Sequence, residues 1–309
     1  MSIPSAPPLA DALERGPLVL DGGLSNQLQA QGCDLSDELW SARLLADDPA
    51  QVQAAHAAYL RAGARVLITG SYQASHPGFA RRGLSRAETD ALLRRSVALA
   101  RAAAAAVAPG EPVWVAASVG PYGAVLADGS EYRGRYGLSV AELERFHRPR
   151  IEALAAAGPD VLALETVPDA DEAEALLRAA AGCGVPVWLS YTVAAGRTRA
   201  GQPLPEAFAV AAGNEQVIAV GVNCCDPRDA GEAVRQAVWV TGKPAVAYPN
   251  SGERWNARRG AWEGETLFDP AEAHAWLRDG ARLVGGCCRV GPEEIARLAR
   301  ELGTAGRAP

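Results

Sequence analysis

Four of the six cysteines in this chain of 309 residues stand in two adjacent pairs, Cys224-Cys225 and Cys287-Cys288. Zinc accepts thiolate ligands in tetrahedral geometry, and catalytic zinc sites keep one of the four positions open. Three cysteines and one open position would fit such a site. The alternative is that the pairs are apolar core residues, because free cysteine is often fully buried. Two pairs in similar settings favour the metal, whereas Cys33 and Cys183 are interpreted as packing residues.

Both cysteine pairs follow short apolar runs that are typical of buried strands. Neighbouring residues of a strand point to opposite faces, so Cys287 and Cys288 can face one metal only where the chain leaves strand geometry. Gly285-Gly286 come directly before this pair and permit a turn at little steric cost. No glycine pair lies next to Cys224-Cys225. We therefore expect two ligands from the second pair and one from the first.

Apolar, β-rich runs alternate eight times with longer helix-like stretches. Most of the runs are continuous in apolar residues, as expected for strands that are buried on both faces. Ser85 with Glu88, and Ser139 with Glu142, have the spacing of capping boxes that open helices. The predicted strands are Leu18–Asp21, Val66–Thr69, Val113–Ser118, Val161–Glu165, Val187–Tyr191, Val217–Asn223, Ala245–Pro249 and Leu283–Gly286. The predicted helices cover about 49–62, 85–109, 139–158, 170–181, 205–212, 228–240, 270–279 and 292–302.

Eight such repeats predict an α/β fold, a closed (β/α)₈ TIM barrel that forms a single domain over residues 1–309. The alternative is an open doubly wound sheet. That fold would be expected to carry G-x-G-x-x-G after its first strand, and the turn at Asp21-Gly22-Gly23 does not supply it. Residues 1–10 and 303–309 are predicted to be mobile ends.

The composition limits the classes of partner. Hydrophobic residues make up 49% and charged residues 21%, and the net charge is −6 with no basic stripe, so we expect no nucleic-acid partner. The chain has no apolar run long enough to cross a membrane, and Met1–Gly16 does not look like a signal peptide. These features predict a cytoplasmic protein without disulfides.

Polar and thiol-bearing residues follow several of the predicted strands at their carboxyl ends, where TIM barrels carry their active sites. Within this set, Gly221-Val222-Asn223-Cys224 and Gly285-Gly286-Cys287-Cys288-Arg289 together resemble the zinc signature of the homocysteine S-methyltransferase family. The match continues in order along nearly the whole chain, and SYQAS (residues 71–75) and YPNSGE (248–253) are most similar to the branch that uses S-methylmethionine. The other matching segments are Asp21–Leu24, Ile68–Gly83, Ser118–Pro121 and Leu164–Pro168.

The resemblance implies roles for particular residues. One Zn²⁺ per chain would be held by Cys224, Cys287 and Cys288, which thereby become the catalytic residues, and two carboxylates would hold the amino group of homocysteine. The carboxylates are Asp21 and Glu165, and the other implied substrate-binding residues are Gly22, Gly23, Ser118 and Asn223. The chain departs from many relatives at Asn26, Gly70, Cys225 and Arg254-Trp255-Asn256, and the last of these puts the methyl donor in question.

The chemistry that the resemblance implies is the transfer of a methyl group from a sulfonium, S-methylmethionine or S-adenosylmethionine, to the thiol of L-homocysteine, which gives methionine. Zinc would deprotonate the thiol and keep it nucleophilic. A sulfonium is a cation, and aromatic faces attract cations. Aromatic residues in the predicted loops and strand ends are therefore candidate donor contacts: Tyr72, Tyr122, Tyr248 and Trp255.

Other functions remain open at this point. The same cysteines could serve a non-catalytic zinc or redox-sensing protein, which would not need Asp21 and Glu165 at the same rim. A methyltransferase could also act on another small thiol or a selenol, or could use betaine as donor. A substitution of Glu165 would distinguish the sensor from the enzyme, because only the enzyme should lose affinity for its substrate.

Overall fold

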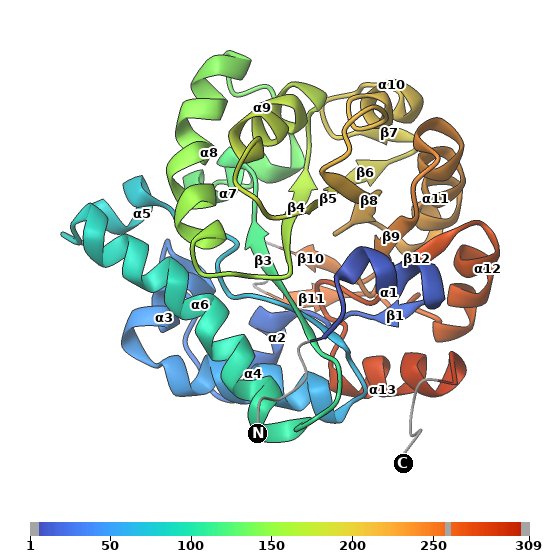
Figure 1. The fold of residues 1–309 in the computed structure, drawn as a ribbon, viewed down its shortest axis with the longest axis horizontal. Helices are drawn as coiled ribbons and strands as arrows, with labels where there is room; N and C mark the ends of the chain where they lie inside the picture. The colour runs from blue at the N-terminus through green and yellow to red at the C-terminus, as the bar shows by residue number, and fades with distance from the viewer. Residues whose placement is uncertain (1–5, 257–260, 304–309) are drawn as a thin grey trace.

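Eight parallel strands form a barrel at the centre of the molecule, and helices surround it (Figure 1). The computed structural model describes residues 6–256 and 261–303. Around the barrel the strands follow the order β1-β12-β9-β8-β5-β4-β3-β2. Their bounds are β1 Leu18–Val19, β2 Val66–Ile68, β3 Trp114–Val119, β4 Val161–Val167, β5 Val187–Tyr191, β8 Val217–Asn223, β9 Ala245–Tyr248 and β12 Ala281–Val284. The predicted TIM barrel is confirmed, and the open doubly wound sheet is not the fold.

The barrel closes between β1 and β2 through a short seam. Leu20 forms a parallel bridge with Val66, and the amide of Asp21 donates to the carbonyl of Val66 at 3.1 Å. The side chain of Asp21 extends this seam, because its Oδ2 accepts the amide N–H of Ile68 at 2.9 Å. A carboxylate thus replaces a backbone acceptor where the two-residue strand β1 is too short to continue the ladder.

Helices connect successive strands and cover the outside of the barrel. Ser85 and Ser139 form complete capping boxes with Glu88 and Glu142, as predicted. No helix within the described residues is both long and apolar enough to cross a membrane. The α-helices are α1 Leu9–Arg15, α2 Leu24–Ala30, α3 Leu44–Asp47, α4 Pro49–Arg61, α5 His76–Ala80, α6 Arg86–Val107, α7 Tyr122–Leu126, α8 Val140–Ala155, α9 Ala170–Ala180, α10 Leu204–Ala209, α11 Pro227–Thr241, α12 Ala273–Arg278 and α13 Pro292–Glu301.

Shorter elements lie in the connections. The 3₁₀ turns are η1 Trp40–Arg43, η2 Ser130–Tyr132 and η3 Pro270–Glu272, and the last of these with α12 makes up the helix predicted over 270–279. Two small antiparallel hairpins follow barrel strands: β6 Val193–Ala194 with β7 Arg197–Thr198, and β10 Arg254–Asn256 with β11 Ala261–Glu263.

Alternation along the strands divides the core into two layers. In β3, Trp114 and Ala116 point into the barrel, whereas Val115 and Ala117 pack against the surrounding helices. Small inward residues leave room for large ones, so Trp188 of β5 fills the interior beside alanines of the neighbouring strands. This pattern explains why the strands read as continuous apolar runs, since both faces are buried.

Helix α1 packs against the inner core layer of the barrel, in contrast to the prediction that residues 1–10 form a mobile end. Leu9 and Leu13 are buried among the side chains that fill the barrel, and the indole of Trp114 donates to the carbonyl of Pro7 at 2.8 Å. The sequence gives little sign of this seven-residue helix, because its apolar residues are few and follow two prolines. Residues 1–5 and 304–309 lie outside the described residues.

We expect Leu13→Ala to lower the free energy of unfolding by about 2–5 kcal/mol, because it removes a fully buried side chain and leaves a cavity at the barrel interior. Chemical denaturation followed by circular dichroism measures this change. Trp239→Ala, which truncates a side chain that is 79% exposed, is the matched control and should change the stability little. Equal stabilities for the two variants would show that α1 contributes nothing to the core.

Candidate active site

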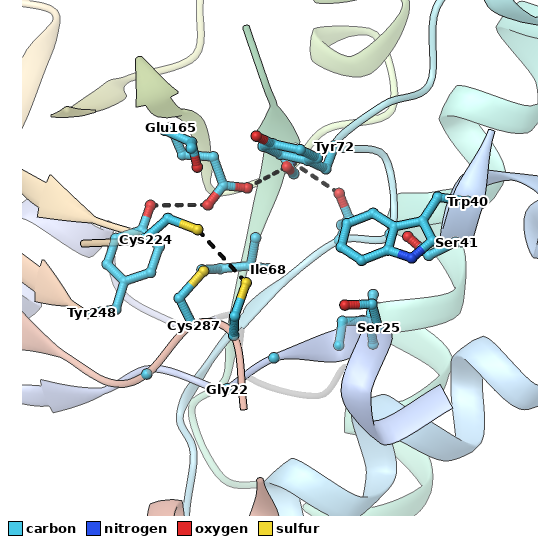
Figure 2. Close-up of a pocket in the computed structure, with 18 of the residues that line it drawn as sticks. Gly22, Ser25, Trp40, Ser41, Ile68, Tyr72, Glu165, Cys224, Tyr248 and Cys287 are labelled. Carbon is cyan, nitrogen blue, oxygen red and sulfur yellow. Dashed lines mark hydrogen bonds between the residues drawn. The ribbon is translucent and has the colours of Figure 1, made fainter. Parts of the chain in front are cut away.

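A pocket opens at the carboxyl ends of the barrel strands and is lined by residues from most of the chain (Figure 2). Its lining contains three cysteines, two carboxylates and three aromatic side chains of loops that follow β1, β2 and β3. Several predicted residues lie here, including Gly22, Gly23 and Ser118. The complete lining is Gly22, Gly23, Leu24, Ser25, Trp40, Ser41, Ile68, Thr69, Gly70, Tyr72, Ser118, Glu131, Tyr132, Glu165, Thr166, Cys224, Tyr248, Gly286, Cys287 and Cys288.

Cys224, Cys287 and Cys288 form a cluster in the wall of this pocket. Their three sulfur atoms all lie within 4.8 Å of one another, and the Sγ atoms of Cys224 and Cys288 are 3.7 Å apart. Figure 2 shows the sulfurs of Cys224 and Cys287 close to each other, and these two residues come from two different chain segments. Such a group offers three thiolate ligands on one side and leaves the opposite side open to the pocket.

A backbone turn after β8 separates the two cysteines of the first pair. Cys224 has a φ of 51°, in the left-handed region, so the strand ends there and the two side chains part. Cys224 faces the pocket, whereas Cys225 is fully buried in the core layer between the barrel and the helices. The turn is held by two hydrogen bonds, from the amide of Cys224 to Tyr248 O at 3.2 Å and from Thr192 Oγ1 to Cys224 O at 3.1 Å.

The second pair lies in a turn just beyond β12, so both thiols can face the same point. The two preceding glycines are needed for close packing and not for an unusual backbone angle. A Cβ on Gly285 would lie 2.6 Å from that of Leu20, and one on Gly286 would lie 2.1 Å from a methyl group of Val290. The chain does leave strand geometry here, as predicted. The two glycines are required because Leu20 and Val290 pack against them, and not because the turn needs an unusual backbone angle.

The loop that follows β9 holds this turn in place. The amide of Cys287 donates to Pro249 O at 2.8 Å, and the amide of Cys288 donates to Asn250 Oδ1 at 3.1 Å. The amide of Ser251 in turn donates to Cys288 O at 2.9 Å. The segment YPNSGE, noted in the sequence for its resemblance alone, thus acts as the support of two cysteines that lie almost forty residues later.

We expect Gly23→Ala to weaken metal binding although residue 23 bears no ligand. A Cβ there would lie 2.6 Å from the carbonyl oxygen of Cys287, which must shift with its thiol. Titration with zinc in the presence of a competing chelator measures the affinity. Gly213→Ala, where nothing lies within 4 Å of the added methyl group, is the control. Unchanged affinity in Gly23→Ala would mean that the cysteine turn tolerates displacement.

The three thiols are not equally acidic. The hydrogen bond with Cys224 lowers the pKa of Cys288 well below its usual range, whereas hydrogen bonds with Cys224 and Cys288, together with burial, raise the pKa of Cys287. The cluster therefore favours one thiolate and keeps the next proton, because like charges at this separation repel. A bound cation would remove this obstacle and allow all three sulfurs to ionise.

Glu165 lies at the floor of the pocket and is almost fully buried. It accepts a hydrogen bond from Ser118 Oγ and one from Tyr248 Oη at 3.0 Å (Figure 2). Burial raises the pKa of the Glu165 carboxyl to about 7, although these two donors favour the charged form. Such a carboxylate is available to pair with a cation that enters the pocket.

Asp21 is also buried but lies just behind the lining, at the β1–β2 seam. Its Oδ2 is used by Ile68, while Oδ1 is buried without a hydrogen-bond partner in the part of the chain that the structure describes. Burial raises the pKa of Asp21 well above its usual range, and the charge of Glu165 adds to the shift. Asp21 therefore has a structural role that the sequence did not reveal, and one oxygen left for a ligand.

Asn223 lies behind the pocket wall, which differs from its predicted place among the substrate contacts. Both ends of its amide bind Thr166: Nδ2 donates to Thr166 Oγ1, and Oδ1 accepts from Thr166 N, both at 2.7 Å. Thr166 has a φ of 57° and lies where the register of β4 against β5 shifts, so it is the extra residue of a bulge. Asn223 holds this bulge, and Thr166 is the residue that reaches the pocket.

Only some of the aromatic residues that were predicted to contact the methyl donor lie in the pocket. Tyr72 and Tyr248 line the pocket. Tyr122 does not, because its ring packs on Tyr136 and Phe146 with centroids 5.2 and 4.9 Å away. The side chain of Trp255 lies outside the described residues, so its predicted contact stays untested.

Among the lining residues that were not predicted are Trp40, Ser41, Glu131 and Tyr132. They come from η1 and η2, in the connections after β1 and β3. The hydroxyl of Tyr132 lies 3.0 Å from the Sγ of Cys224. The signal that could have found Glu131 and Tyr132 is the length of the glycine-rich segment between β3 and α8, because long loops at this end of a barrel carry function.

Comparison with known proteins agrees with this geometry. Residues 18–302 match the sequence model of the family described as homocysteine S-methyltransferase. The chain is 45% identical over 290 residues to the homocysteine S-methyltransferase of Escherichia coli K12, which covers 91% of this chain and 94% of the relative. It is also 45% identical over 306 residues to homocysteine S-methyltransferase 4 of Zea mays, with 93% and 90% covered. The metallated form of the E. coli homocysteine methyltransferase MmuM superposes with a TM-score of 0.85 at 42% identity, covering 95% of this chain and 99% of that one.

Proposed function

Because the chain belongs to the homocysteine S-methyltransferase family, we propose that it uses one zinc ion to transfer a methyl group from S-methylmethionine to homocysteine. The observation that carries the proposal is the cluster of Cys224, Cys287 and Cys288, which opens onto the same pocket as Glu165. Three thiols and a carboxylate that could bind an ammonium group thus line one cavity. A redox sensor would need the thiols but not the carboxylate.

The donor set fits zinc. Three thiolates with one open side match the ligand number and type of a catalytic zinc site, and they are too soft for magnesium or calcium. Bound zinc would supply a Lewis acid that lets a substrate thiol ionise at neutral pH. The residues that would hold it are fixed from outside by the turn after β8 and by the loop after β9, so their positions do not depend on the metal alone.

Homocysteine fits between the cysteine cluster and the pocket floor. With its sulfur at the open side of the cluster, its ammonium group would pair with Glu165, whose pKa of about 7 would fall once a cation is next to it. The free Oδ1 of Asp21 is a second acceptor on the same side of the barrel. The two carboxylates then orient the acceptor and need not move a proton.

The methyl donor enters from the open side, where the sulfonium must approach the acceptor sulfur in line. Tyr72, Tyr132 and Trp40 present aromatic rings to this part of the pocket, and aromatic faces attract a sulfonium. The products are methionine from homocysteine and methionine from the demethylated donor, so the charges balance as a sulfonium and a thiolate become two thioethers.

Assays of reduced protein with homocysteine and each of three donors test the proposal. We expect one zinc per chain and turnover with S-methylmethionine that exceeds turnover with S-adenosylmethionine and with betaine. Turnover with betaine alone would overturn the donor assignment. Full activity after removal of all metal by chelation would contradict the role of zinc.

A further inference from the structure

We propose that Glu131 binds the α-ammonium group of the methyl donor and so selects amino-acid sulfoniums over sulfoniums that lack an amino group. The inference deepens the proposed function and rests on it. Glu131 lies in η2, in the connection between β3 and α8, and its side chain lines the pocket that contains the cysteine cluster.

One oxygen of Glu131 has no partner. Its Oε2 is buried and makes no hydrogen bond within the described residues, which is costly for a carboxylate and indicates that a ligand completes the site. Burial raises the pKa of this carboxyl, and a cation beside it would favour the charged form. The other carboxylate of the lining, Glu165, already accepts hydrogen bonds from Ser118 and Tyr248.

The position of Glu131 is fixed by the packing of its loop. A Cβ on Gly123 would lie 2.5 Å from the amide nitrogen of Glu131, so the chain can pass here only beside a glycine. Asp128 Oδ1 accepts the amide of the preceding Ser130 at 2.9 Å, and the next residue, Tyr132, contacts Cys224 at 3.0 Å. Glu131 is therefore the direct chain neighbour of Tyr132, which contacts one of the three proposed metal ligands.

The charges in the pocket match two ammonium groups. Its lining contains two carboxylates, Glu131 and Glu165, and no lysine, arginine or histidine among the described residues. Homocysteine and S-methylmethionine each carry one α-ammonium group. If Glu165 takes that of homocysteine, Glu131 is the carboxylate that remains in the lining for the donor.

Kinetics separate this role from a structural one. The ammonium charge is the same before, during and after methyl transfer, so an ion pair with it stabilises the ground state and the transition state equally. Its loss should raise the donor KM and leave kcat unchanged. A carboxylate that acted on the sulfonium itself would instead change kcat, because that charge disappears in the reaction.

The test is Glu131→Gln, assayed with S-methylmethionine and with dimethylsulfoniopropionate, a sulfonium without an amino group. We expect the KM for S-methylmethionine to rise roughly 10- to 100-fold, as for the loss of a charged hydrogen bond. The KM for dimethylsulfoniopropionate, the KM for homocysteine and the zinc content should stay unchanged. Glu152→Gln, which makes the same change on the exposed face of α8, is the control and should behave as wild type.

Equal losses with both donors, or a rise in the homocysteine KM alone, would overturn the assignment of Glu131. Calorimetric titration of the homocysteine-loaded protein with each sulfonium measures the same selectivity without turnover. Failure of the wild-type enzyme to methylate homocysteine would therefore refute the proposed function, while the binding difference between wild type and Glu131→Gln would still decide the role of Glu131.

Discussion

Cys287→Ser is expected to lose both bound zinc and methyltransferase activity. The substitution keeps the size and the fold of the turn but replaces a thiolate with a hydroxyl that does not ionise at neutral pH and binds zinc weakly. In zinc sites of this type the ligands are sulfur or nitrogen, and two remaining thiolates leave the ion poorly held. Loss of a group that merely hydrogen-bonds to a ligand already lowers metal affinity roughly 10- to 100-fold, and loss of a ligand should lower it at least as much. We therefore expect less than about a tenth of the wild-type zinc content after dialysis. Zinc per chain and kcat, measured on protein kept reduced throughout, test this expectation.

Two other cysteines serve as controls. Cys225→Ala removes the thiol next to a proposed ligand, but that thiol is buried in the core away from the pocket, so zinc should be retained at a stability cost of about 1 kcal/mol. Cys183→Ser removes a half-buried thiol far from the site and should retain zinc as well. Loss of zinc in Cys225→Ala, with zinc kept in Cys287→Ser, would mean that the ligands are chosen wrongly.

The sequence was sufficient to predict the barrel because each strand is buried on both faces. Runs such as Val161–Val167 and Val217–Asn223 have few polar residues before their last positions, and helices between them begin at recognisable caps such as Ser85. Helix α1 could not be predicted in the same way. Its two leucines pack against the barrel interior, and seven residues are too few for a periodic pattern to appear.

In the site, too, the sequence predicts the residues that lie at strand ends but not those whose roles depend on contacts between distant segments. The cysteine pairs and Glu165 are visible in the sequence because they lie at the carboxyl ends of predicted strands. The role of Asn223 is not, because its partner Thr166 lies in a bulge of another strand, 57 residues earlier. Glu131 and Tyr132 belong to a loop whose path depends on close approach at Gly123, which only the folded chain reveals.

Glu165→Gln is expected to lower kcat/KM for homocysteine by roughly 100-fold, since breaking a buried charge pair typically costs about 2–5 kcal/mol. The loss should appear mainly in the KM for homocysteine, because the ammonium charge does not change during the reaction. The zinc content should remain that of wild type. Steady-state kinetics with each substrate varied in turn measure the effect, and Glu152→Gln again provides the control for the chemical change.

The same substitution should make the protein more stable, which distinguishes a binding residue from a structural one. Burial raises the pKa of Glu165 from 4.5 to about 7, so the folded protein holds a proton that the unfolded chain releases. The contribution of Glu165 to the free energy of unfolding is therefore largest below pH 4.5. It falls as the pH rises toward 7, by about 3 kcal/mol for a pKa shift of this size. Glutamine does not ionise, so the variant should exceed wild type in unfolding free energy at pH 8 and match it near pH 4.5. If the variant is instead less stable than wild type at pH 8, the Glu165 carboxylate stabilises the fold. A loss of activity in the variant could then not be assigned to homocysteine binding alone.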